Sequence, residues 1–212
     1  MAPNKFDPNR TPGIKPGLKK GDIVSDLSII NTNDDIERIR GAMLTFDSFV
    51  RNGPYFGVHQ AGSFLHTTDI ILGDEEDKAL APGDRVKNPR MTFVATMTVN
   101  EDMCNKFGIM HGACAAYLLD SVTTAALVCL EGPPRVSVCL NVSFFRPAPL
   151  GTNLKLIGYS TSVGTSPAHT RGEIWDADKS ILLMDCKHIQ VDPMQDSALP
   201  PKAKMPTATA KL

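Results

Sequence analysis

The longest apolar stretch of the sequence, residues 113–130, restricts the possible fold more than any other feature. It is long enough to cross a lipid bilayer as a helix. Its centre nevertheless contains a carboxylate, Asp120, together with Ser121, Thr123 and Thr124. A charged group at that depth of a bilayer is costly, and no second apolar span or flanking basic cluster accompanies it. We therefore predict a core helix of a globular domain and no membrane span.

Six shorter segments around this helix have the composition of β-strands. Two precede the helix and four follow it: residues 64–72, 90–99, 135–147, 153–163, 168–177 and 180–191. This order is typical of an α+β domain in which an antiparallel sheet lies on one side of a helix. Because the helix is apolar almost all round, we expect the sheet to curl around it or a second subunit to cover its other side.

The remaining residues are predicted to form extensions of one domain that spans residues 63–193. Residues 1–22, rich in Pro, Gly and Lys, should be a flexible arm; a mitochondrial presequence is the alternative, but the prolines disfavour its amphipathic helix. Residues 23–62 should form a helical extension, because Asn33 can cap a segment with apolar side chains at three- and four-residue steps. The polar, Pro-containing residues 194–212 should be a flexible tail.

Composition narrows the possible partners and cofactors. A formal net charge of −1 gives no attraction for nucleic acid. The five cysteines include no C-x-x-C pair, so we expect reduced, buried thiols rather than disulfides. The five histidines have no metal-ligand spacing, and we expect neither a metal nor an organic cofactor.

The start of the helix and its middle each carry a possible catalytic group. Gly112 follows His111 where the first N–H groups of the helix lack internal partners, which suits an anion or an oxyanion. A glycine-containing turn capped by the histidine is the simpler interpretation. Asp120 in apolar surroundings would have the raised pKa of a general base. Alternatively, its side chain could merely form a hydrogen bond with a nearby backbone group or hydroxyl. Thr124 lies on the same face of the helix and could share the site of Asp120.

The spacing of these groups separates them within one chain. His111 and Asp120 are nine residues apart, which is roughly 13 Å along a helix and on opposite sides of it. They cannot act on the same atom unless they come from different subunits. If both are catalytic, we expect a symmetric dimer with two shared sites.

The stretch "NKFGIMHGACAAYLLDSVTTAAL", residues 105–127, resembles the signature of hot-dog-fold acyl-CoA thioesterases of the phenylacetate-pathway and small mammalian type. The resemblance covers roughly residues 63–191 and includes the downstream "RVSVCLNVSFFRPAPLG". It implies an α+β hot-dog fold, in which a curved antiparallel sheet wraps around one central helix. It also implies a homodimer or, as a dimer of dimers, a homotetramer.

The resemblance assigns roles to positions of the motif. Asp120 resembles the catalytic carboxylate, either a general base for water or a nucleophile. Gly112 resembles the residue whose backbone N–H polarises the thioester carbonyl. Asn105 resembles the side chain that positions the water or the carbonyl, and His111 holds this turn or contacts substrate.

Three further positions are expected to contact the substrate. Thr124 and Ser137 resemble secondary site residues of the family. Ala113 departs from the pattern, which has a second glycine there, and its methyl group could narrow the site or shift the entry of the helix. We expect this departure to affect the turnover rate and the acyl preference more than the fold.

The resemblance predicts an acyl-CoA thioesterase. Water attack on a thioester needs a base, an oriented water and a stabilised oxyanion, and the motif offers a residue for each. A serine hydrolase is disfavoured because G-x-S-x-G is absent from the sequence. A non-catalytic acyl-CoA-binding or scaffolding protein is the main alternative, which Ala113 favours; a hydratase or dehydratase is the weaker one.

The last three residues, Ala210, Lys211 and Leu212, resemble the Ser-Lys-Leu peroxisomal address. A small residue, a cation and an apolar terminal side chain are the features that the import receptor reads. We therefore expect a peroxisomal matrix protein with this receptor as a partner. A cytoplasmic or mitochondrial location is the alternative.

Overall fold

The computed structural model describes Ile39, Val50 and residues 56–72, 90–131, 135–162 and 167–192. Within these ranges lie one long helix and six strands, with two short 3-10 turns. In chain order the elements are η1 (Gly62–Phe64), β1 (His66–Leu72), β2 (Met91–Thr98), η3 (Glu101–Met103), α2 (Gly112–Glu131), β3 (Val136–Phe144), β4 (Asn153–Ser162), β5 (Ala168–Asp176) and β6 (Ile181–Val191). All six predicted strands and the predicted core helix are confirmed.

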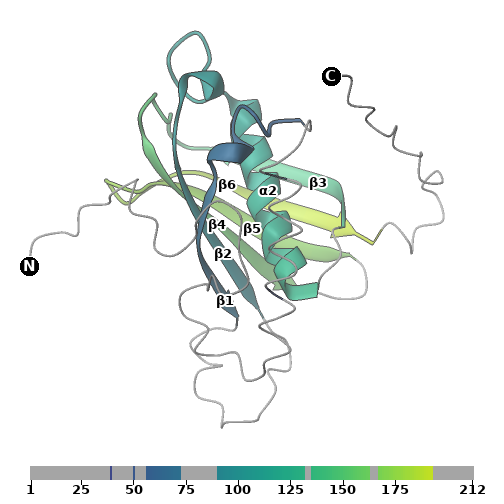
Figure 1. Ribbon diagram of the computed structural model, residues 1–212. Helices are drawn as coiled ribbons and strands as arrows, with labels where there is room; N and C mark the ends of the chain where they lie inside the picture. Colours follow the sequence, from purple (N-terminus) through teal and green to yellow (C-terminus); the bar gives the residue numbers. More distant parts are fainter. Residues whose placement is uncertain are drawn as a thin grey trace, which may run out of the picture.

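The strands form one antiparallel sheet in the order β1-β2-β4-β5-β6-β3. After β2 the chain passes through α2 and enters the sheet at its far edge as β3, and β4 then returns beside β2 (Figure 1). This crossover places α2 along one face of the sheet. Among the described strands, it also makes β3 an edge strand that pairs with β6 alone.

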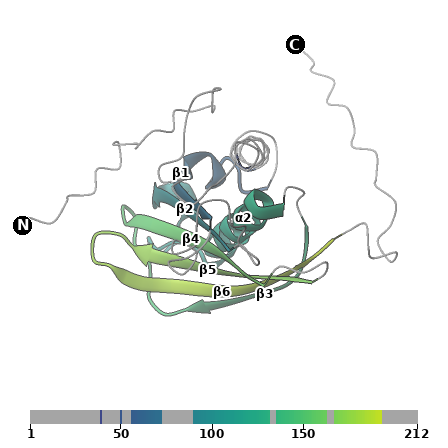
Figure 2. The same cartoon turned by 90° about the horizontal axis from the view of Figure 1, so that it is seen from below.

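The sheet curves around α2, as the apolar surface of the helix required (Figure 2). Two glycines allow the strands to reach the helix backbone. A Cβ atom at Gly158 in β4 would lie 2.1 Å from the carbonyl oxygen of Val122, and one at Gly172 in β5 would lie 2.9 Å from Thr123 Cγ2. Any side chain at these positions would push the strands away, so the glycines set how closely the sheet wraps the helix.

The core lies between α2 and the concave face of the sheet. Fully buried side chains of the helix, among them Leu118 and Leu119, pack with Phe93, Leu154 and Leu156 from the strands. Within the described ranges, Gly112–Leu130 is the one helix with the length and composition of a membrane span, and 67% of it is buried inside the protein. That degree of burial agrees with the predicted core helix.

Part of the N-terminal extension covers the first half of α2. Ile39 and Val50 are both helical, and Ile39 is 2% exposed. The turn that follows packs on Tyr117: the ring of Phe56 meets it edge-on at 5.8 Å between centroids, and Gly57 adopts φ +77 against it. The predicted arm at residues 1–22 and the predicted tail at 194–212 lie outside the described residues.

Candidate active site

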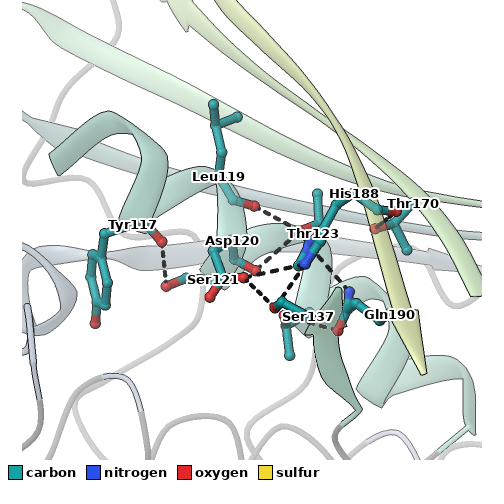
Figure 3. Close-up of polar contacts among 10 residues, drawn as sticks. Tyr117, Leu119, Asp120, Ser121, Thr123, Ser137, Thr170, His188 and Gln190 are labelled. Atoms are coloured by element: carbon teal, nitrogen blue, oxygen red, sulfur yellow. Dashed lines mark hydrogen bonds and ion pairs between the residues drawn. The ribbon is translucent and has the colours of Figure 1, made fainter. Parts of the chain in front are cut away.

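Asp120 lies on the side of α2 that faces β6 and β3, with 42% of its side chain exposed. It is therefore at an opening of the core rather than enclosed in it. Its Oδ1 accepts a hydrogen bond from Ser137 Oγ of β3 at 3.1 Å, and His188 Nε2 of β6 lies 3.4 Å from the same oxygen (Figure 3). No partner for Oδ2 occurs among the described residues, so one oxygen is held and the other is open.

His188 is fully buried beneath this carboxylate. Its Nε2 is 2.9 Å from Ser137 Oγ, and its Nδ1 is 2.7 Å from Thr123 Oγ1 (Figure 3). Burial lowers the pKa of His188, and the nearby charge of Asp120 only partly opposes this effect. The imidazole is consequently neutral at pH 7, with one ring nitrogen protonated.

The number of protons on each group determines which one donates in each hydrogen bond of this cluster. A serine hydroxyl has a single proton, and Ser137 donates it to Asp120. The close contact with His188 then requires Nε2–H to donate to Ser137 Oγ. The buried ring therefore supports the serine, and the serine fixes one oxygen of the carboxylate.

The segment that leads into α2 is held by its own backbone. The side-chain Oδ1 of Asn105 accepts from the N–H of Phe107 at 2.9 Å, and the carbonyl of Asn105 accepts from the N–H of Gly108 at 3.0 Å. Gly108 has φ +70, a conformation that favours glycine. This turn occupies the oxygen of the Asn105 amide and leaves Nδ2 as its available donor.

His111 caps the start of α2. Its Nδ1 accepts from the N–H of Ala113 at 3.0 Å, and its own N–H donates to the carbonyl of Met103 at 2.8 Å. The N–H of Gly112 has no acceptor among the described residues. It therefore remains a free donor at the positive end of the helix dipole.

The surroundings of Gly112 are aromatic on one side. A Cβ atom at this position would lie 3.4 Å from Cζ of Phe144, whose side chain is 55% exposed at the end of β3. Ala113 is exposed, so its methyl group does not enter the core. Its N–H is already bound by His111, which means that Ala113 adds no donor to the pair formed by Gly112 and Asn105.

The structure thus divides the predicted site residues into two groups. Asn105, His111, Gly112 and Ala113 lie at the start of α2. Asp120 lies about 12 Å further along the helix axis, at 1.5 Å per residue, and is joined there by Ser137. The remaining predicted residue, Thr124, donates to Gln190 Oε1 at 3.3 Å.

Two residues of this cluster were not predicted. His188 and Gln190 both lie on β6 and are 0% exposed. Their alternate spacing in a predicted strand was the available signal, because two polar side chains then share the face that covers the helix. The sequence did not indicate which helix residue they would meet.

The cysteines offer no nucleophile here. None of the five, all of which the structure describes, forms a disulfide; Cys139 is exposed, contrary to the expectation of buried thiols, because it lies on the edge strand β3. Burial raises the pKa of Cys114 to about 11 and that of Cys186 to about 12, so both stay protonated at neutral pH. The described ranges contain no group of three metal-ligating side chains.

A family model described as "Thioesterase superfamily" matches residues 107–182. Human acyl-coenzyme A thioesterase 13 is 31% identical over 119 residues, which are 56% of this chain and 79% of that relative. The mouse protein of the same name is 31% identical over 97 residues, 45% of this chain and 69% of its own. The chain belongs to the thioesterase superfamily.

Solved structures support the same assignment of the fold. Zebra fish thioesterase superfamily member 2 superposes with a TM-score of 0.53 at 20% identity, covering 68% of this chain and 91% of that one. Member 2 from Mus musculus gives the same TM-score and identity over 72% and 95%. The curved antiparallel sheet around one helix is the hot-dog fold, and the relatives named acyl-coenzyme A thioesterase 13 support thioester hydrolase activity for this superfamily member.

The buried His188 should make stability depend on pH. Its pKa is 6.5 in the unfolded chain and lower in the folded protein, so unfolded chains bind the extra proton between these values. The stabilisation is complete above pH 6.5 and is lost as the pH falls through the folded pKa. We expect the free energy of unfolding, measured in urea between about pH 7.5 and pH 5.5, to fall with decreasing pH more steeply in the wild type than in His188→Asn. The difference in slope should be up to about 1.4 kcal/mol per pH unit.

The control is His169→Asn on β5, where the side chain is exposed. Its stability should follow that of the wild type across the same range. An identical slope in the wild type and in His188→Asn would contradict a neutral, buried His188.

Proposed function

We propose that the protein hydrolyses acyl-CoA to a free acid and CoA, with Asp120 as the general base or the nucleophile. The single observation that carries the proposal is the state of the carboxylate. One oxygen of Asp120 is fixed by Ser137 and the other is open at a half-exposed position. The acyl-CoA substrate is supported by the relatives named acyl-coenzyme A thioesterase 13.

The open oxygen can orient and deprotonate a water molecule. The water oxygen attacks the thioester carbonyl carbon while its proton passes to Asp120. The C–S bond then breaks, and the sulfur of CoA leaves with the proton from the carboxyl group. Developing charge on the carbonyl oxygen would be stabilised by the free N–H of Gly112 and by Nδ2 of Asn105, which the loop leaves available. No metal or organic cofactor enters this scheme.

As a nucleophile, Asp120 would instead attack the carbonyl carbon directly. The product of that step is a mixed anhydride, which water then hydrolyses. Single turnover in H₂¹⁸O separates the two routes. General-base catalysis places ¹⁸O in the acid, as does attack of water at the acyl carbonyl of the anhydride. Attack at the enzyme-side carbonyl instead places ¹⁸O on Asp120 and gives the acid an unlabelled oxygen of Asp120, so a labelled Asp120 identifies the nucleophilic route.

The active site is proposed to lie between two copies of the chain. Gly112 and Asp120 are about 12 Å apart along one helix, too far to act on a single thioester. The edge strand β3 suggests how a second copy binds: within the described part of the chain it pairs with β6 alone, and Val136, Val138 and Phe144 are exposed on it. A long apolar edge is unusual in a monomer, and antiparallel pairing of two β3 strands about a two-fold axis would continue the sheet.

Such a homodimer has two equivalent sites. Each site would combine the Gly112 end of one α2 with Asp120 of the other α2. A dimer of dimers would keep the same paired sites. His111 contributes by holding the start of the helix, where its Nδ1 caps Ala113.

A non-catalytic acyl-CoA-binding protein is the second possibility, because Ala113 stands where the family pattern has glycine. An assay of free CoA with acyl-CoAs of several chain lengths distinguishes the two. Release of thiol from any of them supports the hydrolase, and binding without release supports the alternative. The same panel reports the preferred acyl length.

Asp120→Asn should reduce turnover by two or more orders of magnitude, the scale of general-base catalysis. Asparagine keeps the shape and can still accept from Ser137, but it cannot take a proton. We expect an unchanged melting temperature and a kcat that is lower by about 100-fold or more in the thiol-release assay. Turnover near that of the wild type in a folded variant would rule out the assigned role of Asp120.

Mixing two inactive variants should test the shared site. After subunit exchange, Asp120→Asn and Asn105→Ala chains form mixed dimers that contain one intact site and one doubly altered site. Half of the dimers are mixed at equal ratios, so about a quarter of total site activity should return. If exchange is demonstrated by mass spectrometry and no activity returns, the two residues act within one chain.

We also propose that the enzyme resides in the peroxisomal matrix. The terminal residues Ala210, Lys211 and Leu212 lie outside the described residues, and their resemblance to a peroxisomal address supports the location. An N-terminal fluorescent fusion should co-localise with peroxisomes, and deletion of 210–212 should make it diffuse. A diffuse full-length fusion in cells that import a control cargo would contradict the location and leave the hydrolase proposal intact.

A further inference from the structure

We propose that Gln190 sets the tautomer of His188 and thereby directs the hydroxyl proton of Ser137 to Asp120. The inference rests on the proposed function of Asp120. Gln190 lies two residues after His188 on β6, and both are 0% exposed. Its amide Nε2 is 3.3 Å from His188 Nδ1, whereas Ser137 contacts the other ring nitrogen, Nε2 (Figure 3).

The tautomer decides which group receives the single hydroxyl proton of Ser137. With the ring proton on Nε2, the ring donates to Ser137 Oγ and the serine donates to Asp120. With the proton on Nδ1, the bare Nε2 would accept from the serine at 2.9 Å, and Asp120 Oδ1 would lose its donor.

Thr123 favours the other tautomer. Its Oγ1 is 2.7 Å from His188 Nδ1, and a hydroxyl can either donate to that nitrogen or accept from it. If it accepts, its own proton bonds the backbone carbonyls of Leu119 at 2.8 Å and Asp120 at 3.0 Å. If it donates to the ring, both carbonyls lose that proton, so the contacts of Thr123 favour a ring protonated on Nδ1.

Gln190 opposes this preference, because an amide nitrogen only donates. The oxygen of the same amide, Oε1, accepts from Thr124 Oγ1 of α2 at 3.3 Å. In this orientation the amide nitrogen of Gln190 favours a bare Nδ1, with the ring proton on Nε2 beside Ser137 and Asp120. The opposite orientation of the amide would present Oε1 to the ring and reverse the tautomer, which makes the tautomer the decisive observable.

The consequence at the catalytic carboxylate is orientation. Hydrogen bonds run in one direction from Thr124 through Gln190, His188 and Ser137 to Oδ1 of Asp120. Holding Oδ1 fixes the plane of the carboxylate and leaves Oδ2 for water. Gln190 is thus a positioning residue that acts through His188, and its loss should lower kcat without changing KM.

The first test is ¹⁵N NMR of the wild-type protein with labelled histidine, at a pH where the ring is neutral. The His188 resonances are identified by their absence in His188→Asn. We expect Nε2 to be the protonated nitrogen and Nδ1 the bare one. A ring protonated on Nδ1 overturns the proposal whatever the activity, and this measurement needs no variant of Gln190.

Gln190→Met removes the donor while keeping a side chain of similar length. We expect the ring to shift toward protonation on Nδ1, which the contacts of Thr123 favour. We also expect a kcat lower by about five-fold, the effect of one net hydrogen bond, with KM unchanged. Thr170→Val is the matched control: Thr170 Oγ1 contacts the backbone carbonyl of His188 at 3.4 Å rather than its ring. It should retain the tautomer and kcat of the wild type.

Gln190→Glu provides a variant with the opposite chemistry. A carboxylate only accepts, so His188 Nδ1 should become protonated in the neutral ring or in an imidazolium. An unprotonated Nδ1 in this variant, or an unchanged tautomer in Gln190→Met, overturns the proposal. An equal loss of kcat in Thr170→Val would do the same. Failure of the proposed function would be seen separately, as full turnover in Asp120→Asn.

Discussion

The direct contact between α2 and the strands β4 and β5 determines the rest of this structure. Gly158 brings β4 against the helix backbone at Val122 and Thr123, and Gly172 brings β5 against the side chain of Thr123, both more closely than a Cβ atom would permit. A sheet held this tightly at its centre must bend to keep its outer strands on the helix. The bend carries β6 and β3 around to the side of α2 that bears Asp120, so the polar site depends on apolar packing elsewhere.

This packing also explains why polar side chains lie inside the core. A buried imidazole or amide without partners would cost several times what its hydrogen bonds return. His188 and Gln190 avoid that cost because Thr123, Thr124 and Ser137 match their donors and acceptors. A fully satisfied cluster is rigid, and rigidity is what a carboxylate needs if one of its oxygens is to stay in a fixed place.

The two ends of the site are built by different means. The start of α2 depends mostly on short-range bonds in the segment that leads into it, with two further backbone bonds to Ala148 and Leu150 in the loop after β3. Asp120 instead depends on partners from β3 and β6, distant in the sequence. The helix fixes the distance between these ends, and this separation is why the proposed chemistry needs a second copy of the chain.

The sequence by itself determined the strands, the core helix and the residues at both ends of the site. These features follow from local periodicity, from glycine and histidine at the helix start, and from one carboxylate in an apolar run. Tertiary structure decided that β3 forms an edge beside β6, and therefore that Ser137 and His188 meet at Asp120. Strand pairing depends on contacts between distant segments, and local periodicity shows that a side chain faces inward but not which side chain it meets there.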